Sequence, residues 1–544
     1  MTYVLAYDIG TTGVKTCVFG VDSGIRLLAG ANEGYGLYLS DDGGAEQDAD
    51  EWWAAMGKTT RAALRKAGVA PEDIAGVSFC SQMQGMVLVD AAGVPVHRPM
   101  SYMDQRSREE LRRGMANGLQ IAGANVVKLA RSLAITGAVS SSVKDPVWKY
   151  KWVERHEPEN FARACKWLDV KEYLLARCTG RFVMTEDSAY ATLLCDTRHG
   201  RTAWSPEMCR MLGVRPEHLA GIIRSTDVAG LLTEKAAAEL GLAPGTPVFG
   251  GGGDASLIGV GAGCVRPGDT HLYCGTSGWV STVLDHQALD TGAMIAAIVG
   301  AQSGLYNYFA EMETAGKCLE WVKDHLALDE IGVYLQKTDV AEGLEAQYTS
   351  LYDYLTETIG RAAPGAGGVV FTPWLHGNRC PFEDPDSAGV FFGIRLETGK
   401  TELLRAVVEG VCFHLRWMLE RQDRKIKTSD PVRFVGGGAL SAVTCQILAD
   451  VTGRTVETVA SPQNVGSVGA AAVAAVGLGL IPSLADVRDF VPVTETYRPN
   501  AENRAVYDRN FAVFTNLYRA NRENFCILAQ KQPEMARAGA RASG

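Results

Sequence analysis

The order of apolar and polar positions at the start of the chain predicts a pair of β-strands followed by a helix. Residues 3–7 and 14–20 are rich in β-branched and aromatic side chains, and the turn D-I-G-T-T-G joins them as the loop of a hairpin. Apolar residues recur at helical spacing over 51–68, and 76–81 is the next strand-like run. Strands that alternate with helices are typical of an α/β domain.

The alternation continues, less regularly, up to residue 225. A second hairpin is predicted at 86–89, with its turn over 90–93. Residues 145–225 are mostly helical in pattern, and the amphipathic stretches 148–157 and 170–179 are the clearest helices. These elements indicate a mixed sheet covered by helices rather than a helical bundle.

The pattern restarts after a cluster of turn residues at 242–247. The strand-like runs 270–274 and 279–284 flank Gly-Thr-Ser-Gly, in the same way that the first two strands flank Gly-Thr-Thr-Gly. A chain of 544 residues is too long for one hydrophobic core, so two large domains are expected. The predicted parts are an N-terminal domain (1–245), a C-terminal domain (246–500), and a last segment (501–544) that consists of a helix and a disordered tail.

Composition and charge narrow the classes of function. The net charge of -9, without a basic stripe, argues against nucleic acid as a partner. The 13 cysteines are scattered and form no C-x-x-C pair, which indicates free thiols that pack in the core of a protein from a reducing compartment. The longest weakly polar run, 468–481, is shorter than the roughly 20 residues that span a bilayer and predicts a buried helix. We therefore expect a cytoplasmic protein with no membrane segment.

The two glycine turns carry most of the candidate chemistry. Glycines let the backbone approach a ligand, and amides together with Thr or Ser hydroxyls form a concavity that suits phosphate groups. Either turn alone can be a tight hairpin without a ligand, but two facing turns favour a nucleotide held between two domains. The predicted phosphate-binding residues are Gly10, Thr11, Thr12, Gly13, Gly275, Thr276 and Ser277.

Three charged residues lie beside the glycine-rich segments. Asp8 precedes the first turn, where a carboxylate beside phosphates needs a cation between them, so Mg²⁺ is expected there. Lys15 follows the turn and either meets a phosphate or is a solvated strand lysine. Asp254 ends a run of four glycines and can take the proton of a substrate hydroxyl. The alternative is that Asp254 only caps the helix expected at 255–261.

A third glycine cluster lies between a strand (432–435) and a helix that begins near residue 441. This arrangement accommodates a ribose or a base edge against bare backbone. The residues predicted to do so are Gly436, Gly437, Gly438 and Ala439. The small residues at 466–469 predict close helix packing near a hinge. The chain has no G-x-x-x-x-G-K-[ST] sequence, so it is not a P-loop enzyme.

Taken in order, these motifs resemble those of the FGGY carbohydrate kinases, and most closely the xylulokinase-like branch. The resemblance runs from D-I-G-T-T-G-V-K to about residue 495. It includes E-Q-D-A-D-E-W-W (46–53), Q-M-Q-G-M-V-L-V-D (82–90), M-D-Q-R-S (103–107), W-K-Y-K-W-V-E-R-H-E-P (148–158), K-E-Y-L (171–174), G-G-G-D (251–254), C-G-T-S-G (274–278) and F-V-G-G-G-A-L-S (434–441).

The resemblance implies an α/β fold of two actin-like (ribonuclease-H-like) domains, with ATP and a sugar in the cleft between them. It implies that Asp8 orders Mg²⁺, that Asp254 is the general base, that Gly275–Gly278 bind phosphates and that Gly436–Ala439 line the adenosine site. By motif position, the residues implied to contact the sugar are Met83, Gln84, Asp104 and Asp254. Homodimers are common in the family, which leaves that oligomeric state open here.

Two positions depart from the xylulokinase pattern, in which a His stands at Gln84 and an Asn at Ala255. Gln can donate and accept hydrogen bonds, whereas the Ala side chain can do neither. The resemblance implies phosphorylation of a ketopentose such as D-xylulose at its primary hydroxyl, giving the 5-phosphate. Other substrates stay open: ribulose, a tetritol or a gluconate. An actin-like or heat-shock-like ATPase without sugar kinase activity is the alternative from another class.

Overall fold

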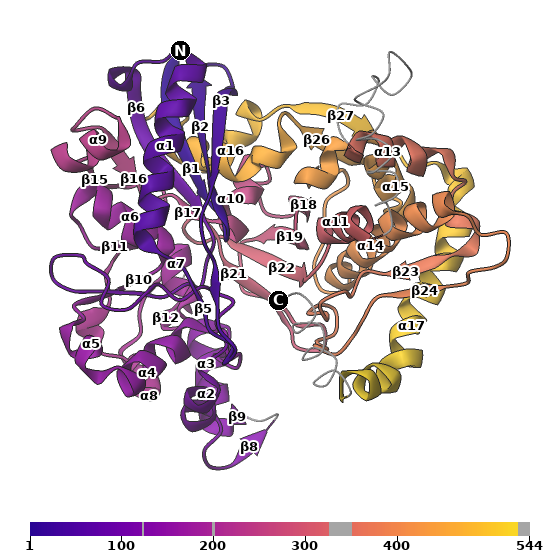
Figure 1. The fold of residues 1–544 in the computed structure, drawn as a ribbon, viewed down its shortest axis with the longest axis horizontal. Helices are drawn as coiled ribbons and strands as arrows, with labels where there is room; N and C mark the ends of the chain where they lie inside the picture. The colour runs from indigo at the N-terminus through magenta and orange to yellow at the C-terminus, as the bar shows by residue number, and fades with distance from the viewer. Residues whose placement is uncertain (122–123, 199–201, 326–350, 531–544) are drawn as a thin grey trace, which may run out of the picture.

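The computed structural model describes residues 1–121, 124–198, 202–325 and 351–530, and each half of the chain contains a large mixed sheet (Figure 1). In the first sheet β1 is parallel to β6 and antiparallel to β2. The strands in spatial order are β15 (Val228–Leu231), β16 (Pro247–Phe249), β6 (Ile74–Ser81), β1 (Thr2–Ile9), β2 (Gly13–Val21) and β3 (Ile25–Gly34), with β17 (Gly252–Gly253) also beside β6.

The second sheet repeats this arrangement. Here β18 is antiparallel to β19 and parallel to β25, which is in turn parallel to β26. The strands in order are β20 (Leu289–Asp290), β21 (Ile295–Val299), β22 (Tyr306–Met312), β19 (Gly278–Leu284), β18 (Thr270–Cys274), β25 (Val432–Val435), β26 (Val456–Val459) and β27 (Val493–Tyr497). In both sheets three strands pair antiparallel (β1, β2 and β3; β18, β19 and β22). Two further strands lie on the other side of the first strand and run parallel to it (β6 and β16; β25 and β26). This is the ribonuclease-H-like order.

Helices cover the faces of the two sheets, and shorter strands lie in the connections. Those of the first half are α1 (Ala49–Ala67), α2 (Arg108–Met115), α3 (Val126–Thr136), α4 (Pro146–His156), α5 (Pro158–Arg163), α6 (Val170–Thr179), α7 (Glu186–Ala191), α8 (Pro206–Leu212), α9 (Glu234–Leu240) and α10 (Asp254–Gly261). Those of the second half are α11 (Gly316–His325), α13 (Leu351–Arg361), α14 (Lys400–Asp423), α15 (Ala442–Thr452), α16 (Val465–Gly477) and α17 (Arg504–Gln530).

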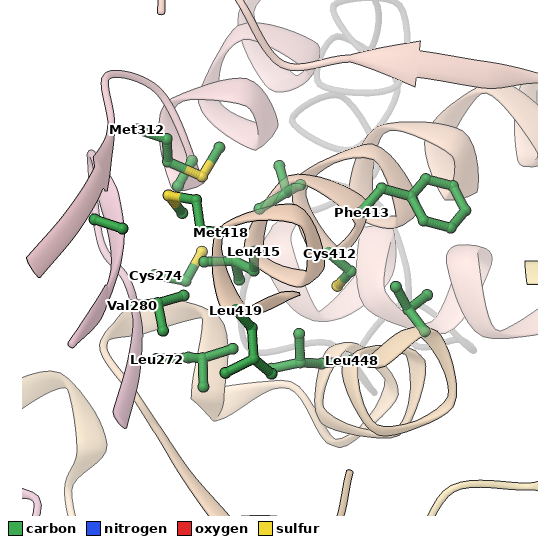
Figure 2. Packing of buried hydrophobic residues seen from close by; sticks show 14 of the residues in the cluster. Leu272, Cys274, Val280, Met312, Cys412, Phe413, Leu415, Met418, Leu419 and Leu448 are labelled. Carbon is green, nitrogen blue, oxygen red and sulfur yellow. The ribbon is translucent and has the colours of Figure 1, made fainter. Parts of the chain in front are cut away.

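Apolar side chains from the second sheet and from α14 form one of the main cores. Figure 2 shows Leu272, Val280 and Met312 of the strands facing Leu415 and Met418 of α14. Cys274 and Cys412 are part of this packing, in line with the expectation that cysteines fill the interior. Burying such side chains is the main favourable contribution to folding. The long apolar face of α14 therefore anchors the sheet that carries the second glycine turn.

Helix α16 belongs to the second half of the chain but packs on β1 and β6 of the first sheet and on α10. A Cβ atom at Gly469 would lie 2.2 Å from the carbonyl oxygen of Leu257, so the two helices can approach only because this residue is small. The predicted buried helix and its close packing are confirmed. The predicted division at 245/246 stays a prediction, and β16 and β17, just beyond it, lie in the first sheet.

Most expected elements are present, with one difference in the first half. The predicted hairpin at 86–93 forms, because the chain after the turn runs back antiparallel to β7 (Val87–Val89), with bridges from Val89 to Pro95 and from Met86 to Met100. The other edge of β7 pairs with β10 (Lys166–Leu168). The mostly helical pattern of 145–225 holds for α4 and α6, but short strands interrupt it, among them β11 (Val183–Thr185) and β14 (Gly221–Ile223). Paired short strands satisfy the backbone where the chain is buried.

The C-terminal helix is confirmed as α17, which packs on α14 and α15. The tail expected to be disordered falls on 531–544, outside the described residues. Within the part of the chain that the structure describes, no helix combines the length and the apolar character needed to cross a membrane.

Candidate active site

The first glycine turn, between β1 and β2, is closed by its own backbone. The Gly10 N–H donates to the Gly13 carbonyl (2.9 Å), and the Tyr35 hydroxyl donates to the same carbonyl (3.0 Å). A hollow of about 480 Å³ lies over this turn and is lined by residues 8–15 of the hairpin, apart from Ile9, and by residues 32–34 of β3. Carbonyls turned inward leave amides and hydroxyls for a ligand, which is the arrangement expected of a phosphate-binding turn.

Asp8 and Lys15 lie opposite each other on β1 and β2, at the edge of this hollow. Burial raises the pKa of Asp8, and the Lys15 charge partly opposes this effect. The Lys15 ammonium donates to the carbonyl of Gln463 (3.1 Å), just before α16. A Cβ atom at Gly466 would lie 3.0 Å from Asp8 Oδ2, so the start of α16 closes over the carboxylate.

Asp254 is the first residue of α10 and follows the short strand β17. The Ala255 N–H donates to Asp254 Oδ1 (2.8 Å), and Gly253, not Asp254, occupies the N-cap position. Burial raises the pKa of Asp254 to about 7, and the negative charges of Asp8 and Glu311 raise it further against the Ala255 hydrogen bond. Asp254 is therefore the first helical residue and not the N-cap, although its carboxylate accepts a first-turn N–H, and its role as general base stays a prediction.

The second glycine turn joins β18 and β19 and is tied to the start of α11. The Gly275 N–H donates to the Ser277 carbonyl (3.0 Å), and the Gly316 N–H donates to the Gly275 carbonyl (2.7 Å). The rings of Tyr273 and Trp279 stack across the strands at 3.9 Å, which fixes the hairpin just below its turn. The second turn is one residue tighter than the first, because Gly10 bonds to the carbonyl three residues on and Gly275 to the carbonyl two residues on.

The third glycine cluster lies directly beside the second turn. Gly436 has a φ of 94°, and a Cβ atom there would lie 2.5 Å from the carbonyl oxygen of Cys274, where β18 ends. Its N–H donates to the Pro462 carbonyl (2.8 Å), in the loop that also receives Lys15 through Gln463. The carboxyl ends of the parallel strands β18 and β25 thus bring the second and third glycine segments together, at the usual place for ligands in such sheets.

The residues expected to contact a sugar lie on the first half of the chain, and Met83 is the one that packs beside Asp254. A Cβ atom at Gly253 would lie 2.0 Å from Met83 Sδ, so Met83 packs against the strand that presents Asp254. Gln84 is half-buried and adjacent. Asp104 is fully buried, and its carboxylate accepts hydrogen bonds from Arg106 Nη2 and the Ala45 N–H, both at 2.8 Å. Direct sugar contacts by Met83, Gln84 and Asp104 stay predictions.

The comparison with known proteins decides the family. The N-terminal domain model of the FGGY family of carbohydrate kinases matches residues 3–261, and the C-terminal domain model matches 271–478. The chain belongs to the FGGY family of carbohydrate kinases. It is therefore an ATP-dependent sugar kinase with the two actin-like domains of that family.

Relatives of this FGGY kinase carry different substrate names. A gluconokinase of Bacillus licheniformis is 27% identical, with 98% of this chain and 99% of the relative covered. A xylulose kinase of Staphylococcus epidermidis is 26% identical, with 96% and 97% covered. The crystal structure of a ligand-bound xylulose kinase from Lactobacillus acidophilus superimposes with a TM-score of 0.81 at 22% identity, with 97% of this chain and 100% of that one covered.

The structure of this FGGY kinase also brings to the site a tyrosine and an ion pair that sequence reasoning missed. Tyr102 accepts a long hydrogen bond from the Thr11 hydroxyl (3.4 Å), and burial and the charges of Asp254, Glu311 and Glu313 raise its pKa. Arg379 forms an ion pair with Glu311 (2.7 Å). No local motif marks Glu311, because β22 reaches the site only through its pairing with β19.

The first half of the chain offers a carboxylate that suits Mg²⁺, but protein side chains would fill only part of the coordination sphere of the ion. Within the described ranges, no group of three or more His, Cys, Asp or Glu side chains converges on one point. Mg²⁺ usually keeps several waters and takes one or two carboxylates together with substrate phosphates. Asp8, whose pKa is raised by burial and whose nearby cation is Lys15, is a suitable single carboxylate.

Proposed function

We propose that this carbohydrate kinase phosphorylates the primary hydroxyl of an uncharged ketopentose such as D-xylulose, giving the 5-phosphate, with Asp254 as general base. The observation that carries the proposal is the position of Asp254. It begins α10 beside Met83, and its pKa is raised to about 7. A general base works best when its pKa is near the working pH, because it is then both largely deprotonated and basic.

In the proposed reaction, the hydroxyl oxygen of the sugar forms a bond to the γ-phosphorus of ATP as its proton passes to Asp254. The bond from that phosphorus to the β,γ-bridging oxygen breaks, and ADP leaves. The turn amides at Gly10–Gly13 and Gly275–Ser277 hold the phosphates, and Gly436–Ala439 lie against the adenosine. Asp8 and Lys15 complete the phosphate side. Bound Mg²⁺ would neutralise phosphate charge there.

The charge around Asp254 supports an uncharged sugar over gluconate. Tyr102 lies at the edge of the candidate sugar site, and the negative charges of Asp254, Glu311 and Glu313 help to raise its pKa. The cation Arg379 is already paired with Glu311 at 2.7 Å. A sugar carboxylate about 6 Å from one of these acids would be repelled by about 3 kcal/mol at an effective dielectric constant of about 20. A neutral polyol meets no such penalty and can donate hydrogen bonds to the carboxylates.

The decisive experiment is a sugar panel that measures sugar-dependent ADP release with ATP and Mg²⁺. D-xylulose, D-ribulose, erythritol and gluconate are compared at matched concentrations, and the product is identified by mass and by the phosphorylated position. We expect the highest kcat/KM for a ketopentose and the 5-phosphate as product. Asp254→Ala serves as the blank for contaminating kinases. A higher kcat/KM for gluconate, absent from the blank, would overturn the uncharged-sugar proposal.

The ATPase alternative has a separate outcome in the same assay. Such a protein would release ADP at a rate that no sugar changes, whereas the family assignment favours sugar-dependent release. A homodimer and a cytoplasmic location stay predictions. Light scattering on the purified protein checks the first, and fractionation of the source cells checks the second.

A further inference from the structure

The backbone of Gln84 has an unusual conformation at the candidate sugar site. Its φ is 63°, in the left-handed region that residues with a side chain seldom occupy. Within the described residues, the hydrogen bonds of Gln84 all come from its peptide groups, and its side-chain amide has no protein partner. Strained backbone persists only where the surroundings hold it, and it gathers at functional sites.

Two buried charged side chains hold the peptide groups of Gln84. The Lys149 ammonium, from α4, donates to the Gln84 carbonyl at 2.7 Å. The Gln84 N–H donates to Asp169 Oδ2 at 2.8 Å, and Asp169 Oδ1 accepts the Val170 N–H (2.7 Å) at the start of α6. Both groups therefore come from helices far away in the sequence and meet at a single residue.

These two charged groups are costly to bury. Lys149 is fully buried, and burial lowers its pKa to about 8 against the charges of Asp104, Asp169 and Asp145. Burial and the nearby Glu172 raise the pKa of Asp169. Such groups are retained where they fix one geometry, and a charged donor or acceptor makes a stronger hydrogen bond than a neutral one. The adjacent Gly85 leaves room for Asp169, since a Cβ atom there would lie 2.8 Å from Oδ1.

We propose that Lys149 and Asp169 are positioning residues that lock the left-handed peptide of Gln84 and thereby determine which sugar this kinase accepts. This inference rests on the proposed function, because it assumes that the Gln84 side chain meets the sugar. The two residues act through Gln84 and do not touch the substrate. With the peptide locked, the unpartnered amide of Gln84 has one orientation and selects one hydroxyl pattern.

The first test removes each contact in the full-length enzyme. Lys149→Met keeps the apolar stem and loses the donor. Asp169→Ser keeps a helix-capping oxygen but is too short to reach the Gln84 N–H, whereas Asp169→Asn keeps an oxygen at the right length. We expect KM for D-xylulose to rise about tenfold in Lys149→Met and Asp169→Ser, with KM for ATP unchanged, and to stay near wild type in Asp169→Asn.

A matched control separates positioning from general stability. Lys166 also donates to backbone carbonyls, those of Glu217 (2.7 Å) and Leu219 (2.9 Å), but it lies on β10 outside the site. Lys166→Met should leave both KM values unchanged. We also expect the ratio of kcat/KM for D-xylulose over D-ribulose to move toward one in Lys149→Met and Asp169→Ser, but not in Lys166→Met. A loss of active protein alone would change neither KM nor this ratio.

A double-mutant cycle decides whether the effect passes through Gln84. In a Gln84→Ala background, Lys149→Met should raise KM for D-xylulose by less than about twofold. Effects that multiply would overturn the positioning role, as would an unchanged KM in Lys149→Met alone. If Gln84→Ala itself leaves KM and the sugar ratio unchanged, the placement of the sugar at Gln84 is wrong, and that failure belongs to the proposed function.

Discussion

Replacing Asp254 with Asn should remove activity and at the same time stabilise the fold. The substitution keeps the shape of the side chain, and its carbonyl oxygen can still accept the Ala255 N–H, a bond of 2.8 Å in the native protein. What is lost is a negative charge in a half-buried position near Asp8 and Glu311. Activity falls because the amide cannot take the sugar's proton, and a general base typically contributes about 10²–10⁴-fold.

The stability gain follows from the pKa of Asp254, which is about 7 in the folded protein against an ordinary value of 3.8. A carboxyl group with a raised pKa destabilises the fold when it is ionised, fully so above about pH 7. The penalty disappears as the pH falls toward the ordinary value, because both states then bind the proton. The difference in pKa corresponds to at most about 4 kcal/mol. Because part of the side chain is exposed and screened by solvent, we expect about 1–2 kcal/mol.

Two assays on the same preparations check this pair of effects. Sugar-dependent ADP release measures activity, and urea unfolding at pH 8.5 and pH 5 measures the change in the free energy of unfolding. Asp104→Asn is the matched control, because Asp104 has a cationic partner in Arg106 at 2.8 Å, so its neutralisation should destabilise. Sugar-dependent turnover retained in Asp254→Asn would show that Asp254 is not the general base. An Asp254→Asn protein that is less stable than the wild type at pH 8.5 would refute the electrostatic reasoning.

Three further predictions concern other parts of the molecule. The kcat/KM for the sugar should fall about tenfold per pH unit below about 7, because Asp254 must be deprotonated; a flat profile from pH 5.5 to 9 would contradict this. Gly436→Ala should lower the free energy of unfolding by about 1–3 kcal/mol, since its φ is 94° and the new methyl group would meet a carbonyl oxygen. Gly437→Ala places its methyl group in open space and should change the free energy of unfolding little. Arg405→Met should lower the free energy of unfolding in urea by about 3–5 kcal/mol, because it leaves the buried Glu409 without the cation that lies 2.7 Å away. Adding Glu409→Leu should recover most of this loss.

Much of the candidate site could be predicted from local signals. The turns at Gly10–Gly13 and Gly275–Gly278 follow strands whose patterns are plain, and the structure has both hairpins in the expected places. Asp254 was found because four glycines precede it and a helix follows. These signals are local because turn geometry and strand pairing across a hairpin depend on neighbouring residues.

Other parts of the site depended on contacts between distant segments. Glu311 reaches Asp254 only because β22 pairs with β19. The pairing of β7 with β10, more than 70 residues later, was not predicted either. Neither contact has a signature in the spacing of apolar residues, since periodicity reports which face of an element is buried and not which element covers it.

The sequence by itself determined the glycine turns, the acids beside them and the class of ligand they suit, because backbone approach and phosphate binding follow from residue type and spacing. The tertiary structure alone decided how these pieces meet. It closes α16 over Asp8, sets Gly436 against the end of β18, and holds the peptide of Gln84 between Lys149 and Asp169. The reason is physical: strand order and helix packing join residues hundreds of positions apart, and those contacts determine burial, charge and geometry.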